Sequence, residues 1–386
     1  MRCGQRKVLD VIYLDYNATT PVLPEVWEAM QPYFMSRWGN PSSAYRFGAQ
    51  LNLEIDKARE SAAGLVRAEA SEIVFTSCAT ESNNAAMHAA LAARPGKRHI
   101  VTSAVEHSAV LNFCKAAENR GYRITYLGVD SEGLLDLAEL KAAIKDDTAL
   151  VSLMWANNET GVMFPVEGIA EICRSKGVLF HCDAVQAIGK IPVDVSHVAA
   201  DYLTMSAHKL YGPKGVGALV IRNGAPFEPM LIGGHQENGR RGGTENVGLI
   251  VGFGVAARLA KRDLATRAAT VGTLRDKLEN QILGTIPGTW VNGSISSRIP
   301  NTTNIGFRGV DSDALVVFLD SQDVCISSGS ACLANALAPS HVVLAMTQSV
   351  ERAKEAIRFS VSHLTEETAI HTAVERAAAG SHLLRQ

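Results

Sequence analysis

The chain contains 386 residues, of which 47% are hydrophobic and 20% are charged, and its formal net charge is -2. This composition is typical of a globular protein, and the near-zero charge gives no basis for expecting nucleic acid or an anionic membrane as a partner. Because the length exceeds that of one usual hydrophobic core, two domains are expected.

Alternating strands and helices are predicted for the first two thirds of the chain. Helical stretches such as ESNNAAMHAALAA and SAVLNFCKAAENR lie between most of the apolar strand candidates. This alternation predicts βαβ units and a mostly parallel sheet with helices on both faces. Residues 215–222 follow the preceding strand too closely for a crossover, so antiparallel pairing is expected there. The strand candidates span residues 72–79, 99–105, 123–129, 149–156, 178–184 and 201–207.

The last third predicts a smaller unit. A helical pattern runs from about Asn246 to about Leu283 and is expected to bridge to a second domain. Short strands (NIGFRG, DVCIS and IRFSV) then alternate with helices. The expected fold class is therefore α/β, with a mostly parallel sheet flanked by helices in a large domain and a smaller α+β domain. The large domain is assigned to residues 19–264, and the small one to residues 1–18 and 265–386.

Polar residues directly after the strands are the candidates for a site, because ligands of open α/β sheets bind outside the carboxyl ends of the strands. Thr80 begins a helix, whose N-terminus suits a phosphate, although an ordinary N-cap explains it as well. His107 follows the next strand, where a satisfied, partly buried histidine is the alternative. Asn158 lies in the polar cluster 157–161, which a tight turn would also explain.

Asp183 and Lys209 follow two further strands. Asp183 lies in an apolar run, where a capping role is the ordinary alternative. A metal site with His181 and Cys182 is not expected, because strand alternation points Cys182 to the opposite face. Lys209 precedes a Gly/Pro loop, so we expect a partly desolvated amine with nucleophilic character.

Residues 206–209 also match S-x-x-K, the motif of penicillin-binding proteins and class A β-lactamases. That chemistry needs the serine and lysine one turn apart on a helix. Here Gly212 and Pro213 follow almost at once, and neither KTG nor SDN occurs in the chain. We therefore reject the β-lactamase interpretation.

Together these residues supply the parts of a pyridoxal phosphate site. Such a site needs a lysine for a Schiff base, a carboxylate for the pyridinium nitrogen, a helix N-terminus for the phosphate and a group that stacks on the ring. A buried Asp183 would keep the ring nitrogen protonated, which the cofactor requires to accept electrons.

The seven cysteines do not predict a disulfide framework or a structural zinc site, because their number is odd and no pair is spaced C-x-x-C. A reducing cytoplasm fits this usage, and the N-terminus lacks the apolar stretch of a secretory signal. No apolar run reaches the about 20 residues of a membrane span. Cys332 lies among small residues, SSGSACLANALAPS, where a flexible turn with an incidental thiol would explain the composition equally well.

The chain resembles the NifS/IscS cysteine desulfurases, in the class V aminotransferase group of fold-type I pyridoxal-phosphate-dependent transferases. The pair SAHK and SSGSAC is the specific feature, and MWANNETG and GRRGGTENV resemble the nitrogen-fixation NifS branch more than the housekeeping one. The motifs in order, over nearly the whole chain, are YLDYNATTPV, TSCATESNN, EHSAV, MWANNETGV, DAVQAIGKI, MSAHKLYGPKGVG, GRRGGTENV, NTTNIGFRGVDSDAL, SSGSAC and IRFSV.

The resemblance implies roles around the cofactor ring. Lys209 would form the Schiff base and move the proton at the substrate Cα. His107 would stack on the ring and act as an acid or base, and Asp183 would pair with the ring nitrogen. Gln186 and Asn158 would lie near the phenolic oxygen.

The resemblance also implies how the phosphate and the substrate are held. Arg358 would clamp the carboxylate of L-cysteine, with Asn158 beside it. Thr244 would reach the phosphate from a second subunit, which implies a homodimer. The other phosphate-binding residues would be Ala79, Thr80, Ser206 and His208.

Cys332 would be the nucleophile that attacks the sulfur of cofactor-bound L-cysteine, leaving a persulfide and releasing alanine. The expected acceptor is a NifU-like iron–sulfur scaffold protein, and the only metal role expected is transient iron–sulfur ligation by Cys332. One alternative is a class V aminotransferase or a selenocysteine/cysteine lyase that does not use Cys332. Another is a non-enzymatic sulfur-binding scaffold, against which the intact Lys209, Asp183 and Arg358 argue.

Two places depart from the family pattern. His235 and Asn238 stand where the family usually has a glycine and an arginine, which would alter a subunit contact or the cofactor edge. Ser362 and His363 replace a Gly-Arg pair, and we expect that change to alter the C-terminal surface without touching the chemistry.

Overall fold

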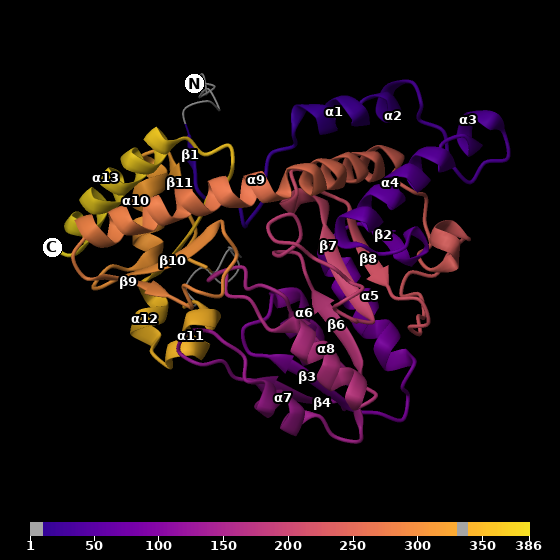
Figure 1. Cartoon of the computed structure of the whole chain (residues 1–386), viewed down its shortest axis with the longest axis horizontal. Helices are drawn as coiled ribbons and strands as arrows, with labels where there is room; N and C mark the ends of the chain where they lie inside the picture. Colours follow the sequence, from indigo (N-terminus) through magenta and orange to yellow (C-terminus); the bar gives the residue numbers. More distant parts are fainter. Residues whose placement is uncertain (1–10, 330–338) are drawn as a thin grey trace.

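The computed structural model describes residues 11–329 and 339–386, and its larger part is built on a seven-stranded sheet (Figure 1). The strand order is β2-β8-β7-β6-β5-β3-β4. The neighbouring strands in the run β7-β6-β5-β3-β4 all pair parallel. Strand β8 pairs antiparallel with both of its neighbours, β2 and β7. The predicted mostly parallel sheet and its antiparallel strand are therefore confirmed. The bounds are Ile73–Thr76 (β2), His99–Ser103 (β3), Arg123–Leu127 (β4), Thr148–Met154 (β5), Leu179–Asp183 (β6), Tyr202–Ser206 (β7) and Gly217–Ile221 (β8).

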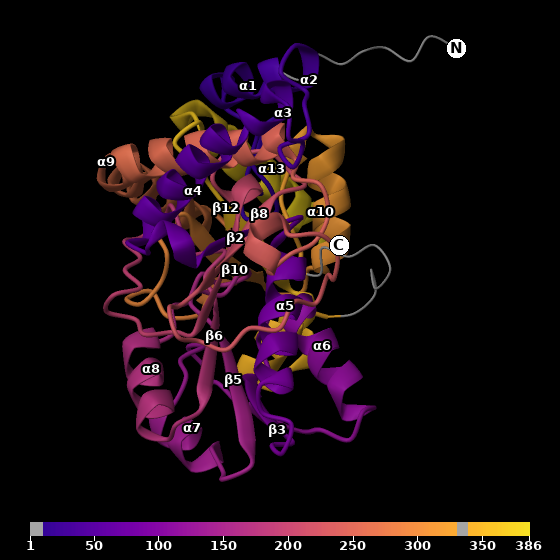
Figure 2. The same ribbon diagram turned by 90° about the vertical axis from the view of Figure 1, so that its right-hand side faces the viewer.

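Helices cover both faces of this sheet, as the side view shows (Figure 2). Successive strand side chains point to opposite faces. Leu150 accordingly belongs to the core that contains Met87, whereas Val151 belongs to the core that contains Ile169. The helices of the first face are α5 (Ala79–Ala92) and α6 (Ser108–Glu118), and those of the second include α4 (Asn52–Val66), α7 (Leu137–Ala143) and α8 (Val166–Ser175).

The helix α9 (Val247–Thr285) joins the two parts of the molecule and confirms the long helix expected from the sequence. The Asn246 side chain caps its first turn by accepting the Leu249 N–H. At Gly254 a Cβ atom would lie 2.5 Å from the Cα of Ala58, so glycine is needed for the close approach to α4. One half of α9 packs in the core of the large sheet and the other half in the second core.

The second core lies between a small antiparallel sheet, β12-β10-β9, and the helices around it. Strand β1 (Ile12–Tyr13) pairs parallel with β11 (Val324–Cys325), so the start of the described chain packs with its last third. Two separate cores support the proposed division at residues 18 and 264, which stays a prediction. The remaining elements here are β9 (Thr289–Asn292), β10 (Thr302–Phe307), α10 (Ser312–Ser321), α11 (His341–Thr347), α12 (Val350–Lys354), β12 (Ala356–Ser360) and α13 (Glu367–Leu384).

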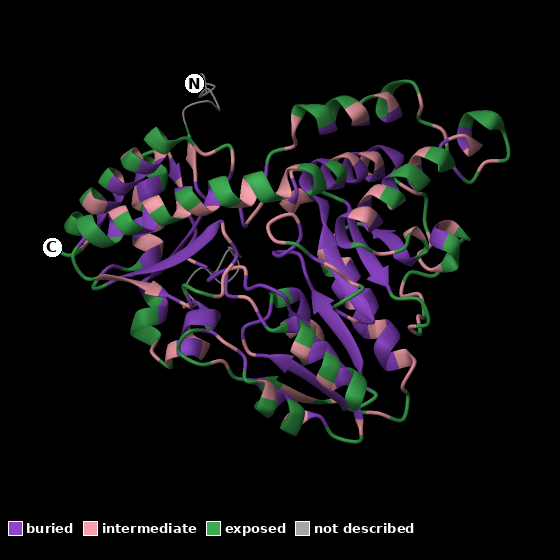
Figure 3. Ribbon diagram, viewed as in Figure 1, coloured by how far each residue is buried: buried purple, intermediate pink, exposed green. Residues whose placement is uncertain are grey.

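The N-terminal helices lie over α9 and α4 at one end of the large part (Figure 1). They are α1 (Pro24–Met30), α2 (Pro32–Met35) and α3 (Arg46–Ala49). Coloured by burial, the strands of the large sheet are buried except the edge strand β4, whereas these helices are largely exposed (Figure 3). Across residues 11–329 and 339–386, every helix is too short or too polar to cross a bilayer.

Candidate active site

A cavity of about 420 Å³ lies where the carboxyl ends of the strands face β12. Several strands contribute the residue at or just after their last position, which is the arrangement expected for an open α/β sheet. The volume suits a small organic molecule. The sequence-predicted residues that line the cavity are Ala79, Thr80, His107, Asn158, Asp183, Gln186, His208, Lys209 and Arg358.

Lys209 ends a three-residue 3₁₀ helix that directly follows β7, which aims its side chain into the cavity. Its amine donates hydrogen bonds to the backbone oxygens of Asn17 and Ala18. Burial, followed by the positive charge of Arg358, lowers the pKa of Lys209 to about 8. At pH 7 about a tenth of the amine is therefore unprotonated, and so nucleophilic, far more than for a lysine in water.

Asp183 occupies the last position of β6 and is buried. Its carboxylate accepts the Asn83 side-chain N–H at 2.7 Å and the Val185 backbone N–H at 3.1 Å. These bonds hold the carboxylate at the cavity wall. Asn83, on α5, was missed by the sequence analysis; its signal was an amide in the middle of an otherwise apolar helix face. Its own side-chain oxygen is buried and has no partner in the described part of the chain.

His181 is held by two hydroxyls and does not reach the cavity lining. Its Nδ1 lies 2.8 Å from Ser152 Oγ, and its Nε2 lies 3.1 Å from Thr204 Oγ1. It is thus a satisfied core histidine. Within residues 11–329 and 339–386, no cluster of three metal-ligating side chains occurs.

His107 is the N-cap of α6, and its Nδ1 accepts the Ala109 N–H at 3.1 Å. Because Nδ1 is an acceptor, the proton of the neutral ring lies on Nε2, the nitrogen left for a ligand. Burial lowers the pKa of His107, so the neutral ring is favoured at neutral pH. The ring can therefore stack on a flat ligand and exchange a proton through Nε2.

Glu106 lies beside His107 with its carboxyl group fully buried. Oε1 accepts the Ser103 hydroxyl at 2.7 Å and the Met154 N–H at 3.0 Å, while Oε2 has no partner in the described residues. Burial raises the pKa of Glu106 to about 8, so the group is protonated over most of the physiological range.

Replacing Glu106 with glutamine keeps the Oε1 acceptor and removes the ionisation. The folded-state pKa is raised, so the wild type loses stability as pH rises from the unfolded pKa of about 4.3 toward 8, by up to about 1.4 kcal/mol per pH unit. We expect the difference in melting temperature between Glu106→Gln and wild-type apoprotein to favour the variant more at pH 8 than at pH 5. An equal difference at both pH values would contradict a buried neutral carboxyl.

The opposite end of the cavity is formed by the N-terminus of α5. Within the described residues no side chain caps this helix, so its first N–H groups are available to a ligand, and Thr80 is exposed there. Ser206, the last residue of β7, is not among the residues that line the cavity; its Oγ is buried and has no partner in the described part of the chain. His208 Nδ1 lies 3.2 Å from Thr19 Oγ1, and burial, followed by Lys209, lowers the pKa of His208 to about 4.

These features fit pyridoxal phosphate. The free helix N-terminus and the unpartnered Ser206 hydroxyl suit a phosphate, and the amine of Lys209 lies in the same cavity as the carboxylate of Asp183. His107 faces that cavity.

Arg358 lies on β12 and is only 2% exposed. One guanidinium nitrogen donates to the Asn158 carbonyl at 3.0 Å and another to Asp15 Oδ1 at 2.6 Å, while Nε has no partner in the described residues. Asp15 therefore holds the guanidinium from one side, and hydrogens on the same nitrogens remain free for a ligand carboxylate. Neither Asp15 nor Asn17 was singled out in the sequence, although both lie in the motif YLDYNATTPV.

The remaining predicted residues lie outside this cavity or outside the described residues. Thr244 is exposed and lines a separate cavity of about 210 Å³ with Arg241, so one chain alone does not bring it to the site. Arg241 is paired with Glu81 on the first turn of α5 at 2.9 Å. Cys332, the expected nucleophile, lies outside the described residues.

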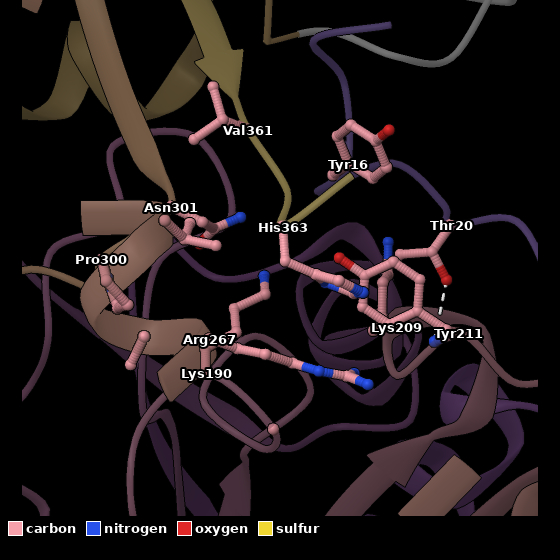
Figure 4. Close-up of a pocket in the computed structure, with 13 residues that line it drawn as sticks. Tyr16, Thr20, Lys190, Lys209, Tyr211, Arg267, Pro300, Asn301, Val361 and His363 are labelled. Carbon is pink, nitrogen blue, oxygen red and sulfur yellow. Dashed lines mark hydrogen bonds between the residues drawn. The ribbon is translucent and has the colours of Figure 1, made fainter. Parts of the chain in front are cut away.

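Ser362 corrects an expectation from the sequence. It is buried, and its hydroxyl lies 2.6 Å from the hydroxyl of Tyr211, so the prediction that this departure alters the surface is wrong for Ser362. His363 packs edge-on against the Tyr211 ring, and both line a small cavity of about 40 Å³ behind Lys209 (Figure 4). Ser362 is buried because the side chain of Tyr211 packs against the two residues that follow the end of β12.

The segment that carries His235 and Asn238 is anchored by Glu237, one of the two residues between them. The buried carboxylate of Glu237 takes two hydrogen bonds from Arg59, at 2.6 and 2.8 Å, and a third from the Phe75 N–H. His235 and Asn238 themselves are exposed. Both departures thus lie on the outer side of a firmly held turn.

Comparisons with known proteins agree with this geometry. Residues 12–372 match the model of the family described as Aminotransferase class-V. A cysteine desulfurase of Nostoc sp. is 52% identical over 95% of this chain and 92% of its own length. Cysteine desulfurase NifS of Azotobacter vinelandii is 46% identical over 93% of this chain and 90% of its own.

Solved structures give the same result. A NifS-like protein superposes with a TM-score of 0.90 at 37% identity, covering 96% of this chain and 98% of that one. SspA in complex with cysteine superposes with a TM-score of 0.81 at 36% identity, covering 91% and 98%.

Proposed function

This chain belongs to the aminotransferase class-V family and is a pyridoxal-phosphate-dependent cysteine desulfurase, and on that premise we propose how its residues convert L-cysteine to L-alanine and take up the sulfur. The observation that carries the assignment of roles is the meeting of Lys209, Asp183 and Arg358 around one cavity. These groups suit an amino acid substrate and a cofactor that accepts electrons.

Each residue has a distinct task. Arg358 binds the substrate carboxylate through its remaining N–H groups, and Asn158 lies beside it. Pyridoxal phosphate, when bound, supplies an electron sink that labilises bonds at the substrate Cα and Cβ. Lys209, with its lowered pKa, binds the cofactor covalently and moves the proton at Cα. Asp183 holds a proton on the ring nitrogen.

The other contacts orient the cofactor. His107 stacks on the ring and offers Nε2 as an acid or base. Gln186 lies near the phenolic oxygen. The phosphate is held by Ala79, Thr80, Ser206 and His208, together with Thr244 of a second subunit.

Cys332 takes the sulfur. Its thiolate forms a bond to the substrate sulfur, the carbon–sulfur bond of the substrate breaks, and the carbon gains a proton. L-cysteine and a protein thiol thus become L-alanine and a protein persulfide, with no external oxidant or reductant. The outer sulfur of the persulfide then passes to a thiol of an iron–sulfur scaffold protein of the NifU-like kind, and Cys332 is left as a thiol. We propose nitrogenase maturation as the setting, in keeping with a relative named NifS, and the cytoplasm as the compartment.

The proposed homodimer is supported by two features. Thr244 lies away from the cavity of its own chain. Large apolar side chains are exposed on and near the N-terminal helices, including Trp27 at 51%, Met35 at 80% and Trp38 at 68%. Apolar exposure of this kind is typical of a surface that a partner covers.

Mixing two inactive variants tests the shared site. Lys209→Ala lacks the amine, and Thr244→Glu places a carboxylate against the phosphate of the neighbouring subunit. Dimers that contain one of each have one intact site, so an equal mixture after subunit exchange should regain about a quarter of wild-type activity. A mixture that stays as inactive as its components would contradict a site shared between subunits.

Product analysis separates this function from an aminotransferase and from a non-enzymatic scaffold. Holoenzyme with L-cysteine should release alanine without any keto acid. An aminotransferase would need a keto acid and would convert L-cysteine to its keto acid. A scaffold would bind sulfur without turnover, so a preparation that forms no alanine would contradict the desulfurase assignment.

A further inference from the structure

Lys190 is a second lysine close to the catalytic one, and the proposed reaction gives it no task. It follows the end of β6 by seven residues, in the motif DAVQAIGKI. Lys190 and Lys209 both line the small cavity behind Lys209 (Figure 4). The residues that line this cavity of about 40 Å³ include no carboxylate. Within the described residues, Lys190 forms no salt bridge; both of its acceptors are amide oxygens, those of Asn17 and Gln186.

The Gln186 amide is oriented by its two contacts. Its Nε2 donates to the Asn17 backbone oxygen at 3.1 Å, and its Oε1 accepts from the amine of Lys190. Turning the amide over would set Oε1 against the Asn17 carbonyl oxygen, an unfavourable contact between two acceptors. The second N–H of Nε2 is thereby left for the large cavity, which Gln186 also lines.

Asn17 connects this contact to the catalytic lysine. Its backbone oxygen accepts from both Lys209 and Gln186, while its side-chain oxygen accepts from Lys190 at 2.9 Å and from Asn301 at 2.9 Å. Asn17 is 1% exposed, so these bonds are shielded from water. Asn17 therefore holds Gln186 and Lys190 in one network that is shielded from water.

Lys190 suits this position as an uncharged amine. Burial, followed by the positive charges of Lys209 and Arg358, lowers the pKa of Lys190 well below its usual value. An unprotonated amine donates to the two amide oxygens without placing an unpaired charge beside Lys209, which would be costly in a buried site.

We propose that Lys190 is a positioning residue for the desulfurase reaction, which holds the Gln186 amide and so fixes one of its N–H groups at the cavity. This inference rests on the proposed function, in which Gln186 meets the phenolic oxygen of pyridoxal phosphate. The hydrogen bond from Gln186 then favours the deprotonated phenolic oxygen, and Lys190 keeps that bond in place.

The test measures the pH midpoint of the cofactor's visible absorption in Lys190→Met, whose side chain has similar length but no amine. We expect the midpoint to rise by about one pH unit and kcat to fall about tenfold, with KM for L-cysteine within about twofold, because the loss of one oriented hydrogen bond is of that order. Lys176→Met, at an exposed lysine, is the matched control and should behave as wild type.

A double-mutant cycle with Gln186→Leu shows whether Lys190 acts through Gln186. In the Gln186→Leu background, Lys190→Met should produce no further shift of the midpoint. A shift that persists there, or an unchanged midpoint and kcat in Lys190→Met alone, would overturn the proposal. If Lys190→Met does not fold, Lys190→Ala replaces it in the cycle, and the same shifts of the midpoint and of kcat support or overturn the proposal. Failure of the proposed function is distinguishable, because the wild type itself would then form no alanine.

Discussion

Replacing Lys209 with alanine is expected to lower alanine formation from L-cysteine by about 10³-fold or more, the order that a covalent amine and a positioned acid–base group contribute together. The amine ends a turn at the carboxyl edge of the sheet and is held by two backbone oxygens. No other described lysine lines the 420 Å³ cavity. The measurement is alanine released per subunit under saturating pyridoxal phosphate.

Covalent attachment of the cofactor to Lys209 can be measured independently of activity in the same variant. Borohydride reduction of the wild-type holoenzyme should leave the cofactor on the peptide that contains Lys209, and no labelled peptide should appear in Lys209→Ala. Lys214→Ala, at an exposed lysine five residues away, is the matched control and should keep both label and activity. Cofactor trapped on another lysine, or activity within about tenfold of wild type in Lys209→Ala, would contradict the assignment.

Replacing Arg358 with lysine is expected to lower kcat/KM for L-cysteine by about 10²–10³-fold, mainly through KM, because truncating one partner of a buried charge pair costs several kcal/mol. A lysine keeps the charge but not the planar fork that two-point binding of a carboxylate needs. It would also weaken the contacts to Asp15 and to the Asn158 carbonyl. Steady-state kinetics with L-cysteine measures the effect.

Arg352→Lys is the matched control for that substitution. Arg352 is exposed on α12, packs over Trp290, and lies outside the residues that line the cavity. It should leave kcat/KM near the wild-type value. An Arg358→Lys variant with unchanged KM would show that another group binds the substrate carboxylate.

Much of the fold and site could be predicted because local patterns determined them. Strand–helix alternation predicted the parallel sheet, and each polar residue after a strand had to lie at the same edge. That logic brought Asp183, His107 and Lys209 to one cavity, as the structure has them. The roles of these residues stay predictions until variants are measured.

What could not be predicted depends on long-range contacts. Asn17 reaches Lys209 across 192 positions of sequence, and Asp15 reaches Arg358 across 343. Neither periodicity nor local motif chemistry indicates which buried amide or carboxylate meets which cation. The prediction that Ser362 alters the surface was wrong for the same reason. Its burial depends on the packing of Tyr211 against the end of β12, a contact between residues far apart in the sequence.

The most direct measurement is a single turnover of the holoenzyme with L-cysteine in the absence of reductant, with mass analysis of the protein, beside the Cys332→Ala variant. We predict about one alanine per subunit, set by one nucleophile per site, and one added sulfur on Cys332, while the variant gives neither. Cys78→Ala, which removes a thiol from the cavity lining, is the control and should keep the sulfur on Cys332. If Cys332→Ala still released alanine at the wild-type rate, Cys332 would not be the nucleophile and a lyase that releases sulfur without it would be the correct description.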